Sequence, residues 1–163
     1  MAQQNFLFDD DGRVVSGING NGTTVITAGD ILFASPPSTS PFGTTVPSGV
    51  DYDEIEVEPI KWATAIGDNA EGCRILGVAL HDAAAGSQVS FSTEGLFLSP
   101  VIDTTGFVQA GFAVRAAEGT TTAGVTNCGT TTGMTPQENR YKIGYALTSA
   151  NVDGDYILWK FSK

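Results

Sequence analysis

Apolar residues in this chain occur in short runs, separated by polar residues or by turn signals. The clearest run, residues 54–58, alternates charged and apolar side chains, the period of a strand with one buried and one solvated face. Further strands are expected within residues 23–34, 74–80, 89–91, 96–98, 107–117, 141–147 and 156–161. The pattern predicts an all-β fold.

Three segments interrupt this pattern. Residues 35–50 hold four of the seven prolines, which exclude a regular helix or a central strand there. Residues 118–135 are rich in Thr and Gly and predict a long loop or a weakly specified hairpin. Residues 1–20 predict an extended N-terminal arm or a first hairpin, so residues 21–163 would form the β body.

One internal similarity supports a repeated strand, corner and strand unit. Residues 75–91 and 143–159 share an Ile, a Gly, an Ala-Leu pair, small residues, a Gly turn and an aromatic end. Gly77 and Gly144 would remove side chains where backbones come close, and Gly86 and Gly154 would permit the turns. The other turn glycines expected in the chain are Gly29 and Gly95.

Composition and charge limit the classes of partner that we expect. Only 16% of residues are charged and 20 are Gly, which favours strands and turns over helices. The net charge of -10 repels phosphate, so nucleic acid is not an expected partner. No apolar stretch is long enough to span a membrane, and the N-terminus has no secretory pattern. We therefore expect no membrane partner and synthesis in a cytoplasm.

Residues suited to catalysis or metal binding are few. The single histidine, His81, stands beside Asp82, but adjacent strand residues point to opposite faces. Cys73 and Cys128 match no metal spacing and are expected as two buried thiols, with a disulfide as the alternative. The acidic run that begins at Asp9 lacks the Glu that a calcium loop needs at its twelfth position. We expect no catalytic residues, no metal and no cofactor.

The residues considered so far leave two functions open. A weaker alternative is a hydrolase that uses a carboxylate pair from the acidic residues 51–58. The stronger alternative is a carbohydrate-binding β-sandwich module involved in host-surface attachment. Its aromatic platform would come from Trp62, Tyr141, Tyr145, Tyr156 and Trp159.

Residues 77–100 read GVALHDAAAGSQVSFSTEGLFLSP, in which a GVA strand, an Ala-rich corner, a strand with the pattern AGxxV and an EG-aromatic strand follow one another. This segment resembles the capsid cement, or head decoration, proteins of bacteriophages. The AGD at residues 28–30 and the GYAL at residues 144–147 are similar to segments of the same family. The loops 35–50 and 118–135 and the N-terminal segment depart from the compact family pattern.

The resemblance implies a small β-barrel or β-tulip-like body with long loops. It also implies a non-enzymatic structural protein of the virion, commonly a homotrimer, that sits on the outer capsid surface over junctions between subunits of the major capsid protein. Such a protein stabilises the head by bridging those subunits. The apolar arm residues Phe6, Leu7 and Phe8 and the loop residue Phe42 are the candidates for contact with the capsid.

Overall fold

The computed structural model describes residues 6–9, 14–20, 25–34, 55–59, 75–102, 107–117, 123–128 and 141–162, with the backbone alone for residues 6–9 and 56. The elements of these residues are strands, which confirms the all-β prediction. In chain order they are β1 (Phe6–Asp9), β2 (Val14–Asn19), β3 (Ile31–Ala34), β4 (Glu56–Pro59), β5 (Ile75–Ala79), β6 (Gln88–Ser92), β7 (Gly95–Pro100), β8 (Ala113–Ala116), β9 (Val125–Asn127), β10 (Gly144–Ala146) and β11 (Tyr156–Phe161).

Five strands form a closed barrel, which confirms the prediction of a small β-barrel and which we call lobe 1. The strand order is β2-β4-β3-β5-β6, with β6 pairing back to β2. The β2–β4 pair is parallel and the other pairs are antiparallel. Apolar side chains fill the interior: Ile26, Leu32, Val57, Ala79, Ala83, Val89 and Phe91.

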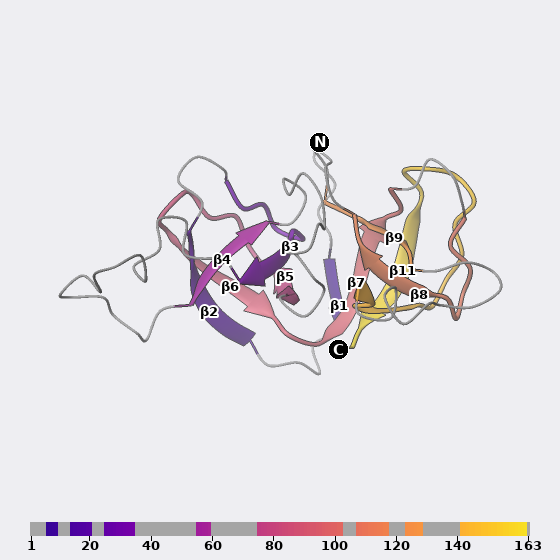
Figure 1. The fold of residues 1–163 in the computed structure, drawn as a ribbon, viewed down its shortest axis with the longest axis horizontal. Coiled ribbons are helices and arrows are strands. Elements are labelled where there is room, and N and C mark those ends of the chain that lie inside the picture. Colours follow the sequence, from indigo (N-terminus) through magenta and orange to yellow (C-terminus); the bar gives the residue numbers. More distant parts are fainter. Residues whose placement is uncertain are drawn as a thin grey trace.

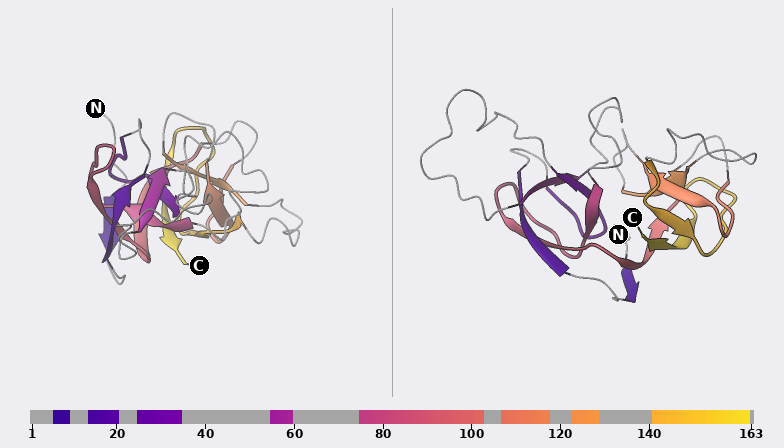
Figure 2. Two further views of the ribbon diagram at one scale, coloured as in Figure 1. Left: turned by 60° about the vertical axis from the view of Figure 1, so that its left-hand side comes forward. Right: turned by 60° about the horizontal axis from the view of Figure 1, so that its bottom comes forward.

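The remaining strands form a second sheet, which we call lobe 2, with the order β1-β7-β11-β10-β8-β9. Val101, directly after β7, makes an isolated parallel bridge with Val125 of β9. This bridge brings the last strand of the sheet back to β7. The two lobes lie side by side along the long axis of the molecule, joined by the short connection from β6 to β7 (Figures 1 and 2).

The first two strands, β1 and β2, belong to different lobes. The backbone of β1 pairs antiparallel with β7, with Phe6 opposite Leu98 and Leu7 opposite Phe97. After a short connection, β2 enters the barrel of lobe 1 and pairs with β4 and β6. The N-terminal strand therefore pairs within its own chain, at the junction of the two lobes (Figure 1).

The Thr- and Gly-rich segment 118–135 contains a strand that its composition does not indicate. Residues 125–127 form β9, which pairs antiparallel with β8, and the side chain of Val125 is fully buried. A strand therefore lies within the segment for which the sequence predicts a long loop or a weakly specified hairpin. The pairing supplies the order that the low-complexity sequence lacks, because a strand is stabilised by its neighbours more than by its own propensity.

The lobes are packed together through one side of lobe 1. Along β3, Leu32 points into the barrel interior, whereas Ile31 and Phe33 belong to a second core cluster. That cluster contains the interior of lobe 2, including Phe97 and Trp159. The alternation along β3 thus serves two cores, one on each face of the strand.

Candidate functional site

Each lobe has an exposed corner that joins two of its strands. In lobe 1 the corner comprises residues 80–87 and the adjoining residues 25–29; in lobe 2 it comprises residues 147–155 and 107–111. The two segments of each corner are held together by a single antiparallel bridge, Ile26–Ala83 in lobe 1 and Val108–Ala150 in lobe 2. Both bridges are closed by two backbone hydrogen bonds of 2.9–3.0 Å.

Equivalent backbone groups in the two corners form equivalent hydrogen bonds. The N–H of Gly29 donates to the carbonyl oxygen of Ala79 at 2.8 Å, and the N–H of Gly111 donates to that of Ala146 at 2.7 Å. Both glycines have a φ of +89°, in the left-handed region that favours glycine. The similarity between residues 75–91 and 143–159 is therefore part of a repeat in three dimensions, and it includes segments far away in the sequence.

Side chains support the same positions in both corners with different chemistry. The N–H of Ala28 donates to Oδ1 of Asp82 at 2.8 Å, and the N–H of Ala110 donates to Oγ of Ser149 at 2.9 Å. Such bonds satisfy backbone groups that no strand partner reaches. The carboxylate of Asp82 therefore stabilises the corner.

His81 has a structural role in this corner. Its Nε2 accepts a hydrogen bond from the N–H of Ser90 at 2.9 Å, and its Nδ1 lies 2.9 Å from the carbonyl oxygen of Asp82. A neutral ring with its proton on Nδ1 satisfies both contacts. Both nitrogens thus contact backbone groups of the corner and of β6.

The exposed apolar side chains of the corners are the feature that sequence reasoning missed. Val25 is 53% exposed in lobe 1, and Phe107 and Val152 are 39% and 62% exposed in lobe 2. Val25 and Phe107 each directly precede the bridging residue of their lobe. The available signal was an apolar residue beside turn residues, which is weak because isolated exposed apolar residues are common.

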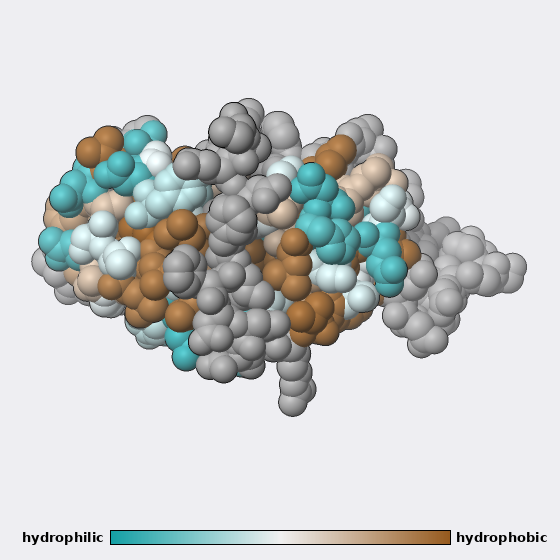
Figure 3. Space-filling model, turned by 180° about the vertical axis from the view of Figure 1, so that it is seen from behind, coloured by the Kyte–Doolittle hydropathy of each residue, from teal (hydrophilic) through white to brown (hydrophobic). Residues whose placement is uncertain are grey.

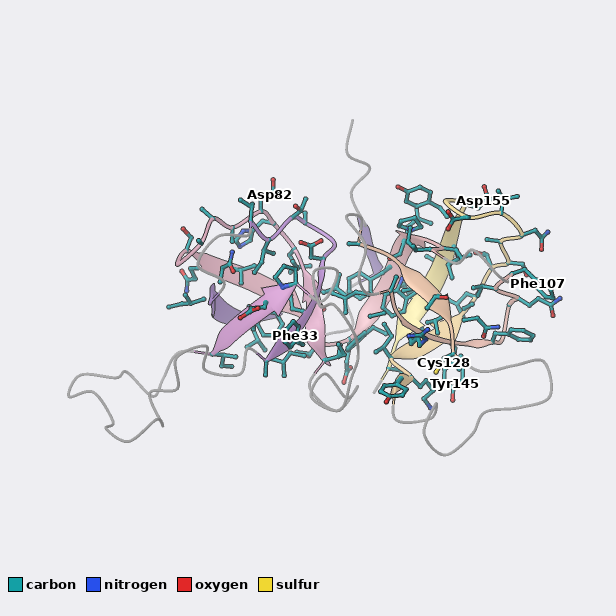
Figure 4. The ribbon with its side chains drawn as sticks, turned by 45° about the horizontal axis from the view of Figure 1, so that its top comes forward. Phe33, Asp82, Phe107, Cys128, Tyr145 and Asp155 are labelled. Atoms are coloured by element: carbon teal, nitrogen blue, oxygen red, sulfur yellow. The ribbon has the colours of Figure 1, made fainter. Side chains whose placement is uncertain are left out.

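Both corners reach the upper margin of the molecule. Asp82 of the first corner and Asp155 of the second are at the upper margin of the two lobes (Figure 4). Apolar surface also reaches the upper edge of both lobes when the molecule is seen from behind (Figure 3). Phe107, in the other segment of the second corner, lies at the outer end of lobe 2 in the same view (Figure 4).

The other candidates from the sequence are distributed through the fold. Phe6, Leu7 and Phe8 lie in β1, and Phe42, Trp62 and Cys73 lie outside the described residues. The side chain of Cys128 is buried. Trp159 is fully buried, whereas Tyr145 is 40% exposed, so these two aromatic residues do not share one surface.

Chemistry for catalysis or metal binding is sparse in the described ranges. No group of three His, Cys, Asp or Glu residues is placed there to hold a metal ion. Burial raises the pKa of the Tyr156 hydroxyl above its usual value. Among these same residues, no helix is long and apolar enough to cross a membrane.

Comparison with known proteins agrees with this architecture. A family model described as phage cement protein matches residues 59–161, more than half of the chain. The chain belongs to the phage cement protein family. This membership supports a structural role in the phage head and confirms the resemblance seen in residues 77–100.

A solved structure has a similar fold along nearly the whole chain. It is the head fiber gp8.5 N base of bacteriophage phi29, with a TM-score of 0.51 and 16% sequence identity. The match covers 92% of this chain and 95% of that one. The search of curated proteins found no match.

Proposed function

We propose that this member of the phage cement family is a non-enzymatic protein that decorates the outer capsid surface and bridges subunits of the major capsid protein. The observation that carries the proposal, beyond family membership, is the pair of similar corners, which both reach the upper margin of the molecule. Each corner would contact one subunit of the shell.

Two contacts on a rigid body resist the separation of the subunits that they join. The lobes share a core cluster that includes Phe33 and Trp159, so the corners are held at a fixed spacing. Once one corner is bound, the second binds at a high effective concentration, and modest contacts become strong together. Expansion or rupture of the shell would first have to break both contacts.

The partners and location follow from this mechanism. The protein would be made in the host cytoplasm and added to the virion surface as a homotrimer, which multiplies the contacts further. The arm residues Phe6, Leu7 and Phe8 and the loop residue Phe42 remain candidates for additional contact with the capsid. No cofactor takes part in such a mechanism.

Cosedimentation with expanded shells of the parent phage that lack this protein tests the proposal. Wild-type protein should sediment with the shells and raise the temperature at which they rupture. Phe107→Glu combined with Val152→Glu places two charges on the corner of lobe 2 and should weaken sedimentation at least tenfold. Both side chains are exposed, so the variant should keep the fold.

Lys160→Glu is the matched control, because it also changes the net charge by two negative units and lies on β11 outside both corners. It should bind as the wild type does. Equal loss of binding in the control would show that general repulsion, not the corner, is responsible. Wild-type protein that fails to bind the shells would contradict the proposed function itself.

A further inference from the structure

The two exposed corners end in turns that are closed by equivalent hydrogen bonds. In lobe 1 the N–H of Gly86 donates to the carbonyl oxygen of Asn19 at 2.8 Å. In lobe 2 the N–H of Gly154 donates to the carbonyl oxygen of Val101 at 2.7 Å. Both glycines have a positive φ, of +71° and +89°. Gly86 and Gly154 therefore occupy the same position in the two lobes.

A second pair of hydrogen bonds aligns the residues around these glycines. The N–H of Ser87 donates to the carbonyl oxygen of Ala84 at 3.0 Å, and the N–H of Asp155 donates to that of Val152 at 3.1 Å. Each bond spans three residues and encloses the glycine of its turn. The four residues AAGS of lobe 1 are thus equivalent, one by one, to the four residues VDGD of lobe 2.

The same turn carries different chemistry in the two lobes. All four residues are exposed in each turn. The turn of lobe 1 presents two methyl groups and a hydroxyl group. The turn of lobe 2 presents the side chain of Val152, which is 62% exposed, and the carboxylates of Asp153 and Asp155. Since small neutral residues form the turn in lobe 1, the fold itself does not require the apolar and acidic side chains of lobe 2.

Phe107 lies next to the turn of lobe 2. It is 39% exposed and directly precedes Val108, whose bridge to Ala150 brings it beside the start of the turn. Phe107 marks the outer end and Asp155 the upper margin of lobe 2 (Figure 4). We call Phe107 and residues 152–155 the lobe 2 tip.

The acidic side chains of the tip are not the ones that support its corner. In lobe 1 the carboxylate of Asp82 accepts the N–H of Ala28, whereas in lobe 2 the hydroxyl of Ser149 has the equivalent role. The corner of lobe 2 contains no Lys or Arg, and its charged residues are Asp153 and Asp155. The lobe 2 tip therefore combines apolar side chains with negative charge.

We infer that the lobe 2 tip is the stronger of the two shell contacts and binds a segment of the major capsid protein in which a Lys or Arg lies beside an apolar residue. Phe107 and Val152 would lose water against the apolar residue, and the carboxylates would pair with the cation and fix the orientation. A second copy is a poor occupant, because an acidic tip repels a chain whose net charge is -10.

The inference rests on the proposed function and adds the chemistry of the partner to it. The corner of lobe 1, whose exposed large apolar side chain is Val25, forms the second and weaker contact. The first contact then sets the position of the protein, and the second gains from the high effective concentration that the first provides.

Exchange of the turn sequences between the lobes tests the inference. Val152→Ala, Asp153→Ala and Asp155→Ser together convert VDGD to the AAGS of lobe 1. The variant should fold, because lobe 1 forms the same turn with these residues. Its affinity for expanded shells that lack this protein should fall about tenfold or more.

The reciprocal exchange is the matched control. Ala84→Val, Ala85→Asp and Ser87→Asp give lobe 1 the turn of lobe 2 and leave the lobe 2 tip intact. This variant should bind the shells at least as tightly as the wild type does. If the two exchanges weaken binding equally, the lobe 2 tip is not the stronger contact and the inference is overturned.

A pair of charge reversals tests for a basic partner. Asp155→Lys should weaken shell binding about tenfold or more, and a rise from about 50 mM to about 500 mM NaCl should weaken binding by the wild type. Glu94→Lys makes the same change in net charge. Glu94 is exposed and precedes Gly95, which pairs with Phe161 at the end of β7 away from the corner. It should bind as the wild type does, and equal losses from both reversals would contradict a basic partner at the tip.

Photo-crosslinking identifies the segment that the tip contacts. A benzophenone amino acid in place of Val152 keeps an apolar side chain there, and the full-length protein is irradiated on the shells. We expect mass spectrometry to find crosslinks to a shell peptide that contains Lys or Arg beside an apolar residue. Crosslinks only to acidic peptides, or only to another copy of this chain, would overturn the inference.

The outcomes distinguish this inference from the proposed function. If the wild type binds the shells and the AAGS variant of lobe 2 binds them equally well, the inference fails and the proposed function stands. A wild type that does not bind contradicts both. Melting curves show whether each variant is folded. Phe107→Ser with Val25→Ser as its counterpart makes the same comparison without changing either turn, and the loss should be larger for Phe107→Ser.

Discussion

His81 and Thr148 occupy the same position in the two lobes, although their side chains have nothing in common chemically. Nε2 of His81 accepts the N–H of Ser90, and Oγ1 of Thr148 accepts the N–H of Leu158, each at 2.9 Å. In each lobe, the acceptor residue directly follows the Ala-Leu pair at the end of a strand. The repeat therefore preserves a hydrogen-bond role and not a residue type.

This equivalence predicts a small effect of His81→Ala on stability. The N–H of Ser90 loses its side-chain acceptor, but the site is exposed and water can replace it, so we expect a loss of about 0.5–1.5 kcal/mol. Urea unfolding followed by fluorescence measures it. Thr148→Val is the matched change in lobe 2 and should cost about the same. Loss of shell binding by His81→Ala with unchanged stability would instead show a functional histidine.

Substitution of two glycines should reduce the stability of the fold much more. A Cβ at Gly77 would overlap the carbonyl oxygen of Ser92, and one at Gly144 would overlap that of Lys160. Since backbone cannot move aside cheaply, Gly77→Ala and Gly144→Ala should each lose about 3 kcal/mol or more, or fail to fold. Gly86→Ala is the control: its φ is +71° but the space around it is open, so we expect about 1–2 kcal/mol. A Gly144→Ala variant as stable as the control would contradict the close approach.

The strands of the repeat could be predicted because their sequence carries local signals. β5 and β10 have the same Gly and Ala-Leu pattern, and the turns that follow contain Gly86 and Gly154. The duplication of whole lobes could not be predicted, because equivalent positions have diverged in chemistry. Val78 is buried between lobes where Tyr145 is exposed, so a comparison of side chains hides what the pairing of backbones shows.

The exposed corners could not be predicted from the sequence, for a related reason. Val25 and Phe107 lie 82 residues apart and share only a short Ala-Gly pair three residues further on. The bridges of the next residues to Ala83 and Ala150 show that the two occupy the same position. β9 was hidden in the same way, because Val125 is buried by β8 and by the bridge to Val101 and not by any pattern of its own. Such features depend on register between distant segments, which a single sequence does not contain.

A buried hydrogen bond in lobe 2 gives a third prediction. Nε1 of Trp159 donates to Oγ of Ser99 at 2.8 Å, and both residues are buried. Ser99→Ala leaves the indole N–H without this partner and should cost about 1–3 kcal/mol in urea unfolding. Adding Trp159→Phe to Ser99→Ala completes a double-mutant cycle. If the two changes are simply additive, the hydrogen bond contributes nothing and the prediction is wrong.

The hydroxyl of Tyr156 should make the free energy of unfolding depend on pH in alkaline solution. Burial raises the pKa of its hydroxyl in the folded chain above 10.0, so the folded state favours the neutral form. The contribution to stability is fully present below the unfolded pKa, near 10, and is lost as the pH rises through the folded value. Tyr156→Phe cannot ionise, so its stability relative to the wild type should increase between pH 9 and pH 11, about the unfolded pKa of tyrosine. Urea unfolding of both proteins across this range measures the difference, and a constant difference would mean that the hydroxyl is as well solvated in the folded chain as in the unfolded one.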